Sequence, residues 1–212
     1  MKKIFIVAIM AVMGLHVQAQ IVSSRSAMTT RQVIEEPKTN TGWSTFGFEY
    51  LPSSFSFKHN SESFSGFAVN YTNATSVTQS IPLFIEWGIG AQFSNYSEED
   101  VLTIHYASIK VPLNIVYDFQ IPNTSINLDP YIGLKFRGNV WGEWKDEYND
   151  ESYNLFDKDE VDWKRFQIGW NLGMKVRFGD KFFLGVGYGS DFSEMAEDMK
   201  INETSLSLGF VF

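Results

Sequence analysis

The sequence predicts an all-β fold, an eight-stranded antiparallel transmembrane β-barrel of the outer-membrane type. Three observations carry this prediction: a short apolar leader at the N-terminus, period-two alternation from Gly42 onward, and the composition of the two strand faces. One face is bulky and apolar, and the other holds glycine, polar and charged residues. The length of 212 residues suits one domain.

The composition excludes several classes of function. The chain contains no cysteine, which removes disulfide scaffolds, thiolate metal sites and cysteine nucleophiles. It carries 17 Lys and Arg against 25 Asp and Glu, so binding to nucleic acid is not expected. An aromatic content of 16% is too high for a disordered acidic chain.

Residues 1–19 are predicted to be a cleaved signal peptide. Two lysines precede the apolar run Ile4–Leu15, and Val17 and Ala19 place small residues before the expected cleavage point. A membrane anchor is the alternative, but the run is shorter than the roughly 20 residues that a spanning helix needs. We therefore expect export.

The mature chain divides into a lead-in and a barrel. Residues 20–41 are polar and without period, which predicts a flexible periplasmic segment. The barrel is expected over 42–212, where eight alternating runs each predict one strand. The runs are 42–50, 63–72, 81–94, 103–119, 126–140, 162–178, 181–191 and 202–212.

The two parities of these runs indicate which face points inward. In the run 81–94, Leu83, Ile85, Trp87, Ile89, Ala91 and Phe93 alternate with Glu86, Gly88, Gly90 and Gln92. A soluble sandwich would also alternate, but glycine has no reason to line a solvated face. Glycine on the polar parity is typical of a crowded barrel interior, and the bulky face suits lipid.

A membrane-spanning sheet must close, because lipid satisfies no backbone hydrogen bonds. With eight strands, side chains can fill the interior. Buried charges are tolerated when paired, so we expect layers of ion pairs in place of an open channel. The predicted interior charges are Glu49, Glu86, Asp118, Asp129, Lys135, Arg137, Lys175 and Arg177.

The connections predict an orientation. Short turns at 179–180 and 120–125 alternate with the longer connections 51–62, 95–102, 141–161 and 192–201. Outer-membrane barrels have short periplasmic turns and longer external loops, so the N- and C-termini of the barrel should both be periplasmic. Two aromatic girdles are then expected. The girdle at the outer membrane–water interface would contain Trp141, Trp144 and Trp163, and the girdle at the periplasmic interface would contain Tyr117, Phe119, Phe178 and Phe182.

The last strand ends on Phe212, preceded by Leu206, Leu208 and Phe210 on the same parity. This pattern resembles the C-terminal signal that the barrel assembly machinery recognises in bacterial outer-membrane proteins. The resemblance implies assembly through that machinery.

Two short segments carry a family resemblance. Ser108–Leu113 (SIKVPL) and Asp129–Leu134 (DPYIGL) resemble patterns of the PorT-like outer-membrane β-barrel proteins of Bacteroidota. The resemblance implies an outer-membrane location and the barrel fold. It brings no catalytic residues, although some relatives assist protein secretion.

No catalytic, cofactor-binding or metal site is predicted, and the chain is not expected to be an enzyme. A lipid deacylase would need a Ser–His pair at the outer interface. His59 falls in the first outer loop, and His105 lies on the lipid-facing parity. Ser108 has the opposite parity and should face away from His105.

The acidic loops are the strongest functional signal. Loop 142–162 holds nine Asp and Glu residues, and all the acidic residues except seven are assigned to the outer loops. This count includes Asp191 and Glu203, which lie at the loop-end limits of the runs 181–191 and 202–212. The seven exceptions are Glu35, Glu36, Glu49, Glu86, Asp118, Asp129 and Asp180. A solvated acidic crown is one reading. The other interpretation is contact with divalent cations or with a cationic partner. Asp157, Asp159 and Glu160 resemble part of a calcium-binding loop, but Asp162 stands where that loop requires Gly and Ile168 stands where it requires Glu.

These features predict a monomer embedded in outer-membrane lipids, with a filled lumen and a structural or interaction role. A small pore and an accessory factor in protein secretion are the alternatives. A secreted soluble sandwich is the remaining possibility.

Overall fold

The computed structural model describes residues 42–212 except 59, 99, 100, 147, 150, 158 and 160. The predicted signal peptide 1–19, the predicted lead-in 20–41 and His59 lie outside the described residues. None of the described residues forms a helix with the length and apolar character needed to cross a membrane.

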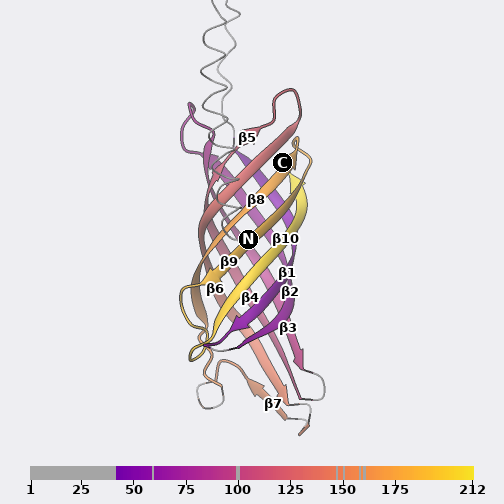
Figure 1. Cartoon of the computed structure of the whole chain (residues 1–212), viewed down its shortest axis with the longest axis vertical. Helices are drawn as coiled ribbons and strands as arrows, with labels where there is room; N and C mark the ends of the chain where they lie inside the picture. The colour runs from indigo at the N-terminus through magenta and orange to yellow at the C-terminus, as the bar shows by residue number, and fades with distance from the viewer. Residues whose placement is uncertain are drawn as a thin grey trace, which may run out of the picture. The chain divides into compact units, whose positions relative to one another are not determined.

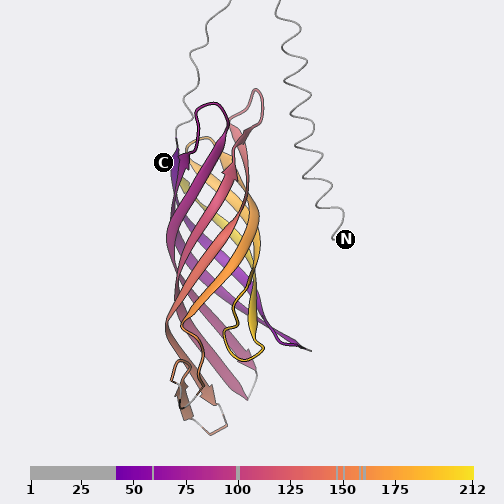
Figure 2. The same cartoon turned by 90° about the vertical axis from the view of Figure 1, so that its left-hand side faces the viewer.

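Eight long strands form a closed antiparallel barrel, which confirms the predicted fold (Figures 1 and 2). Strands that follow one another along the barrel wall pair with each other, and the first pairs with the last to close it. Two short strands, β5 (Phe119–Gln120) and β7 (Glu151–Asn154), add to β6. The wall strands are β1 (Trp43–Ser56), β2 (Ser61–Ser76), β3 (Leu83–Glu98), β4 (Leu102–Tyr117), β6 (Ile126–Asp146), β8 (Phe166–Phe178), β9 (Phe182–Asp191) and β10 (Lys200–Val211).

The faces are arranged as the parity predicts. In β3, Trp87 and Ile89 are about half exposed on the outer face, whereas Glu86 in the same strand is 1% exposed and points inward. The last strand repeats this arrangement, with Leu208 and Phe210 outside. Bulky apolar side chains therefore form the outer belt, and polar side chains fill the inside.

The two ends of the barrel differ. The end that carries Trp43 and Phe212 is called the terminal end, and the opposite end, where β7 lies, is called the loop end (Figure 1). At the terminal end Gly179 adopts φ +61° in the tight turn between β8 and β9, which glycine allows at little cost.

The predicted long connections 51–62 and 95–102 are wrong, because the strands continue through them. Residues 57–60 alone join β1 to β2, and 99–101 alone join β3 to β4. In β1 the inward parity carries Thr45 and Gly47 near the terminal end, but Leu51 and Phe55 near the loop end. The apolar residues thus move from the outer face to the inner face along β1. A rule that requires an apolar outer face therefore does not recognise the loop-end part of this strand. At the loop end, residues 147–165 and 192–199 remain the longer connections.

A β-bulge corrects the predicted position of Trp144. Ala107 pairs with Trp141 and Ser108 pairs with Asn139, so Val140 is an extra residue in β6. Val140 and Trp141 are both exposed, and the parity reverses after them. Trp144 consequently points inward and does not join an outer girdle, whereas Trp141 lies on the outer face as predicted.

The predicted girdle position of Trp163 is also wrong. Trp163 is 8% exposed and belongs to an apolar cluster at the loop end, because its connection folds back over the barrel mouth. Its backbone N–H donates to the Leu155 carbonyl over 2.8 Å. At the terminal end, Phe178 and Phe182 stack with ring centroids 4.7 Å apart on the outer face.

Apolar clusters close both ends of the barrel interior. The terminal-end cluster consists of Trp43, Ala74, Phe84, Val116, Phe183 and Val211. The loop-end cluster consists of Phe55, Phe64, Tyr106, Leu155, Trp163, Met195, Met199 and Ile201. Between them the interior is polar.

Candidate functional site: the closed lumen and the loop end

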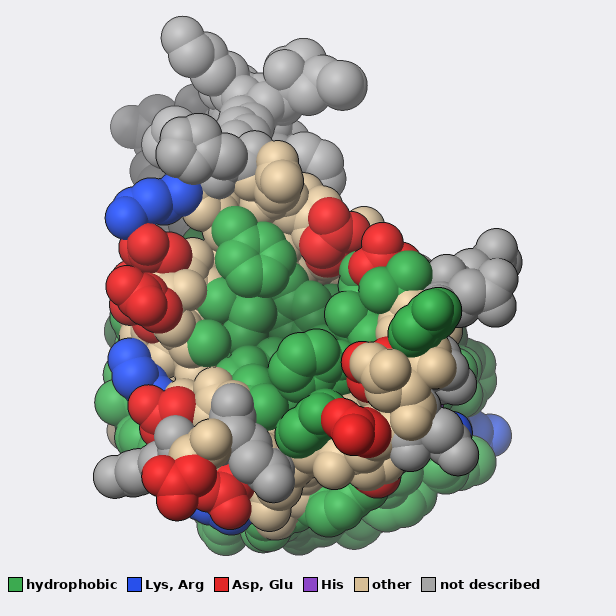
Figure 3. All heavy atoms as spheres, turned by 90° about the horizontal axis from the view of Figure 1, so that it is seen from below, with side chains coloured by type: hydrophobic (Ala, Val, Ile, Leu, Met, Phe, Trp, Pro, Cys, Tyr) green, Lys and Arg blue, Asp and Glu red, His purple; other side chains and the backbone are tan. Residues whose placement is uncertain are grey.

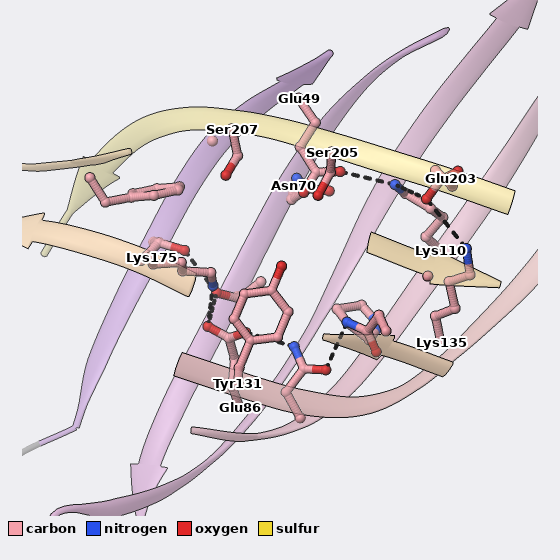
Figure 4. Close-up of a pocket in the computed structure, with 18 of the residues that line it drawn as sticks. Glu49, Asn70, Glu86, Lys110, Tyr131, Lys135, Lys175, Glu203, Ser205 and Ser207 are labelled. Carbon is pink, nitrogen blue, oxygen red and sulfur yellow. Dashed lines mark hydrogen bonds and ion pairs between the residues drawn. The ribbon is translucent and has the colours of Figure 1, made fainter. Parts of the chain in front are cut away.

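The lumen holds a first group of charges between β3 and β8. The Lys175 ammonium forms an ion pair with the Glu86 carboxylate (Figure 4). Glu86 also accepts hydrogen bonds from the Asn114 amide over 3.0 Å and from the Thr72 hydroxyl over 3.1 Å. Asn171 donates to Asn114 over 3.0 Å. The buried carboxylate is therefore satisfied from several directions, as burial requires.

A second group lies nearer the terminal end. The Arg177 guanidinium contacts Asp129 and lies 3.1 Å from an Asp118 carboxylate oxygen. Its carbon atom Cζ is 3.6 Å from the ring centroid of Trp43, which belongs to the terminal-end cluster. This cation–π contact joins the charged group to the terminal-end cluster.

A third group lies toward the loop end. The Lys110 ammonium is 2.9 Å from Glu49 and 3.7 Å from Glu203, and Lys135 is 3.5 Å from Glu203 (Figure 4). The Gln92 amide donates to Glu203 over 3.1 Å. Two lysines and two carboxylates from four strands thus cross the lumen at one level.

The fourth group joins Arg137 to Asp191, and both side chains are 1% exposed. This group and the third correct the assignment of Asp191 and Glu203 to the outer loops, because both carboxylates lie inside the barrel. Their inward parity in the predicted runs 181–191 and 202–212 was the available signal, but both residues were counted with the adjoining loops because they lie at the loop-end limits of these runs. Ion-pair layers are confirmed, and Lys110 belongs to them as well.

A small polar cavity of about 80 Å³ lies among these groups. Its lining includes Glu49, Glu86, Lys110, Tyr131 and Lys175 (Figure 4). Such a volume accommodates a few water molecules. Among the described residues, apolar clusters and ion pairs block the lumen on both sides of this cavity, so it does not form a continuous aqueous path.

Glycine makes room for these side chains. A Cβ atom added at Gly173 would lie 2.5 Å from the Tyr131 hydroxyl oxygen, and one added at Gly187 would collide with the same hydroxyl. Tyr131 therefore occupies space that side chains on β8 and β9 would otherwise fill. At these two positions, the glycine parity predicted from the sequence has this steric cause.

The loop end has an apolar centre and an acidic periphery (Figure 3). The apolar centre consists of partly buried side chains that pack on the loop-end cluster: Tyr96, Ile104, Trp144, Phe156, Val161 and Ala196. We call these six residues the apolar floor. The described part of the loop end, residues 56–64, 95–106, 142–166 and 192–201, carries eleven acidic residues, which we call the acidic rim: Glu62, Glu98, Glu143, Asp146, Glu151, Asp157, Asp159, Asp162, Glu194, Glu197 and Asp198.

Local contacts shift two pKa values at the loop end. The Asn149 side-chain amide donates to the Asp146 carboxylate over 2.9 Å, and this hydrogen bond lowers the pKa of Asp146 below its ordinary value. The Lys58 ammonium lies 2.8 Å from Asp198, and this hydrogen bond and the charge of Asp198 raise the pKa of Lys58. Both groups therefore stay charged at neutral pH.

The structure places His105 and Ser108 on opposite faces of the wall, as their parity predicts. The His105 ring lies on the outer face with its centroid 5.9 Å from that of Phe93. The buried Ser108 hydroxyl donates to the Asn139 amide oxygen over 2.6 Å inside the barrel. These two residues do not form a nucleophile–base pair.

Of the three residues that resemble part of a calcium loop, Asp157 and Asp159 are described, whereas Glu160 lies outside the described residues. The Asp157 carboxylate accepts a hydrogen bond from the Asp159 backbone N–H over 3.0 Å. Where the structure describes the chain, no group of three or more His, Asp or Glu side chains is arranged to hold a metal ion.

Comparison with known proteins places this geometry in a family. Among solved structures, the chain is similar to Ail, the attachment invasion locus protein of Yersinia pestis, crystallised with the heparin analogue sucrose octasulfate. The identity is 14% and the TM-score 0.51, over 81% of this chain and 99% of that chain. Neisserial surface protein A (NspA) is 13% identical with a TM-score of 0.49, over 81% of this chain and 97% of that chain.

The outer membrane enzyme PagL is 12% identical with a TM-score of 0.47, over 76% of this chain and 98% of that chain. No curated protein sequence matches the chain. The model of the family described as "Outer membrane protein beta-barrel domain" matches residues 6–212. Because this match covers nearly the whole chain, the protein belongs to the outer membrane protein beta-barrel domain family.

Proposed function

We propose that this outer-membrane barrel is a closed, monomeric, non-enzymatic interaction protein that presents its loop end to the outside of the cell. The observation that carries the proposal is the contrast between the closed lumen and the open loop end. The lumen is filled by paired charges between two apolar clusters, whereas the loop end combines an apolar floor with an acidic rim. Surface contact is therefore a better basis for function than transport.

The proposed orientation places the terminal end in the periplasm. It is supported by the tight turn at Gly179 and by the connection 147–165 at the loop end, which is longer than any connection at the terminal end. It also suits a signal peptide at 1–19, cleaved before a periplasmic lead-in. The exposed Phe212 then lies where the barrel assembly machinery would meet the last strand.

Membership of the PorT-like subgroup of Bacteroidota is proposed on the two motifs quoted above. Ser108–Leu113 lies in β4 and Asp129–Leu134 lies in β6, and these strands are neighbours in the wall. Leu113 pairs with Leu134, so the two motifs form one patch of the barrel. A contribution to secretion would use the loop end or the terminal end, since the lumen is closed.

Introduced cysteines test the orientation, because the chain contains none. We would make Tyr148→Cys at the loop end, where the side chain is 88% exposed, and Asp180→Cys in the β8–β9 turn as its matched control. A membrane-impermeant maleimide should label Tyr148→Cys on intact cells and label both variants after lysis. Labelling of Asp180→Cys alone on intact cells would overturn the orientation.

Location and folding are tested on the unmodified chain. The protein should fractionate with the outer membrane and migrate faster on a gel before boiling than after it. Recovery in the soluble periplasmic fraction, with no heat-dependent migration, would overturn the proposal.

A further inference from the structure

We propose that the loop end binds a cationic amphipathic peptide segment, with the apolar side chains of the peptide on the apolar floor and its cations against the acidic rim. The inference rests on the proposed function, because it assigns a partner class to the surface proposed there to face outward.

The floor is a surface that one apolar face could cover. Tyr96, Ile104 and Trp144 come from three neighbouring strands, β3, β4 and β6, that extend beyond the rest of the wall. Phe156 and Val161 join them from the connection that folds back over the mouth. Apolar side chains gather at the centre of this end in Figure 3. Grouped apolar side chains of this kind mark interaction surfaces.

The rim selects the charge of the partner. Against its eleven acidic residues, the described part of the loop end carries five basic residues: Lys58, Lys145, Lys164, Arg165 and Lys200. The acidic side chains surround the apolar centre on several sides in Figure 3. An anionic partner would be repelled, whereas a partner that combines cations with apolar side chains complements both features.

The chain's own cations already make the contacts that the peptide would make. The Arg165 guanidinium lies 4.7 Å from the ring centroid of Phe156, a floor residue. The Lys58 ammonium lies 2.8 Å from Asp198, a rim residue. Floor aromatics therefore accept a cation over the ring, and rim carboxylates accept an ammonium. A peptide of alternating Lys and Leu offers more groups of both kinds.

The test uses the full-length protein in nanodiscs of zwitterionic phosphatidylcholine. The probe is a fluorescently labelled 14-residue amphipathic Lys/Leu peptide, and its binding is followed by anisotropy. A Glu/Leu peptide of the same pattern and empty nanodiscs serve as controls. We expect saturable binding of the Lys/Leu peptide to protein-bearing discs, weakened by added salt. Equal binding to empty discs, or equal binding of the Glu/Leu peptide, would overturn the inference.

Rim and floor variants locate the site. The triple variant Asp157→Asn, Asp159→Asn, Asp162→Asn should weaken binding about five- to tenfold, since each exposed charge pair contributes little alone. Asp180→Asn at the terminal end is its charge control and should bind normally. Phe156→Ser should also weaken binding, whereas Phe192→Ser, an exposed loop-end residue outside the floor, should not.

Folding and orientation are read separately from binding. Each variant must keep heat-modifiable migration, so that a loss of binding is not a loss of the barrel. Unchanged affinity in both the folded triple variant and the folded Phe156→Ser variant would overturn this inference alone. The cysteine labelling described above would still decide the proposed function, because it measures orientation without a peptide.

Discussion

The Arg137 guanidinium donates hydrogen bonds to both carboxylate oxygens of Asp191, although the two residues lie on strands that are not neighbours. Arg137 is on β6 and Asp191 is at the end of β9, with β8 between them. The pair therefore links β6 to β9 through the lumen, in addition to the backbone hydrogen bonds that each strand forms with β8. Each side chain is 1% exposed, so neither charge has water as a substitute partner.

Asp191→Ala should lower the free energy of unfolding by about 3–5 kcal/mol, because it leaves the buried Arg137 charge without its main partner. Urea titration of the protein refolded into phospholipid vesicles measures the change. Asp180→Ala, which removes a carboxylate from an exposed turn, is the control and should change little. Equal unfolding midpoints for the two variants would contradict a structural role for the luminal pair.

Gly133→Ala should destabilise the barrel by about 1–3 kcal/mol through overpacking. The added Cβ would lie 2.6 Å from the Asn114 Cα and would collide with the Leu113 carbonyl oxygen. Gly138→Ala, in the same strand, has no heavy atom within 4 Å of the added Cβ and is the matched control. The same urea titration compares them, and similar destabilisation of both variants would show that steric crowding is not the reason for glycine at Gly133.

Fluorescence quenching by brominated lipids should distinguish Trp141, which faces lipid, from Trp163, which does not. Trp141 is 46% exposed on the outer face, whereas Trp163 is 8% exposed inside the apolar cluster. Trp141→Phe should therefore reduce the fraction of fluorescence that lipid quenches, and Trp163→Phe should leave that fraction the same or raise it. A larger decrease for Trp163→Phe would contradict the inward position of the connection that carries it.

Phe212→Ala should reduce assembly into the outer membrane several-fold, because the resemblance of the last strand to the assembly signal includes its terminal aromatic residue. Phe210→Ala is the control, since Phe210 is 62% exposed and Phe212 is 65% exposed on the same face. The assembled fraction is measured by heat-modifiable migration of membrane fractions. Equal assembly of both variants would refute a special role for the last residue.

Parity, together with the need for a membrane-spanning sheet to close, predicted the barrel, its eight strands and most of its inward charges, but not Lys110, Asp191 or Glu203. Successive side chains of a strand point to opposite faces, so the outward position of Trp87 and the inward position of Glu86 follow from the sequence pattern. The individual ion pairs were not predictable, because the register and tilt of strands distant in sequence decide which charges meet. Lys110, for instance, contacts carboxylates from both β1 and β10.

The loop end was less predictable for two physical reasons. The rule of an apolar outer face holds only where lipid surrounds the wall, and beyond it Leu51 and Phe55 turn apolar groups inward. A single extra residue, Val140, then reverses the parity of β6 and carries Trp144 to the floor. The first effect ended one predicted strand at 50 and the second ended another at 140, whereas β1 continues to Ser56 and β6 to Asp146. Asp191 and Glu203 have a different cause: they lie at the loop-end limits of the predicted runs 181–191 and 202–212 and were counted with the adjoining loops.

Single-channel recording in planar lipid bilayers tests the central claim, a lumen closed by paired charges between two apolar clusters, most directly. The purified protein should insert without producing steady conductance, because no continuous aqueous path crosses the described barrel. Insertion is verified on the same preparation by heat-modifiable migration after reconstitution. Stable, large and uniform openings from correctly folded protein would contradict the closed lumen and would restore a pore as its function.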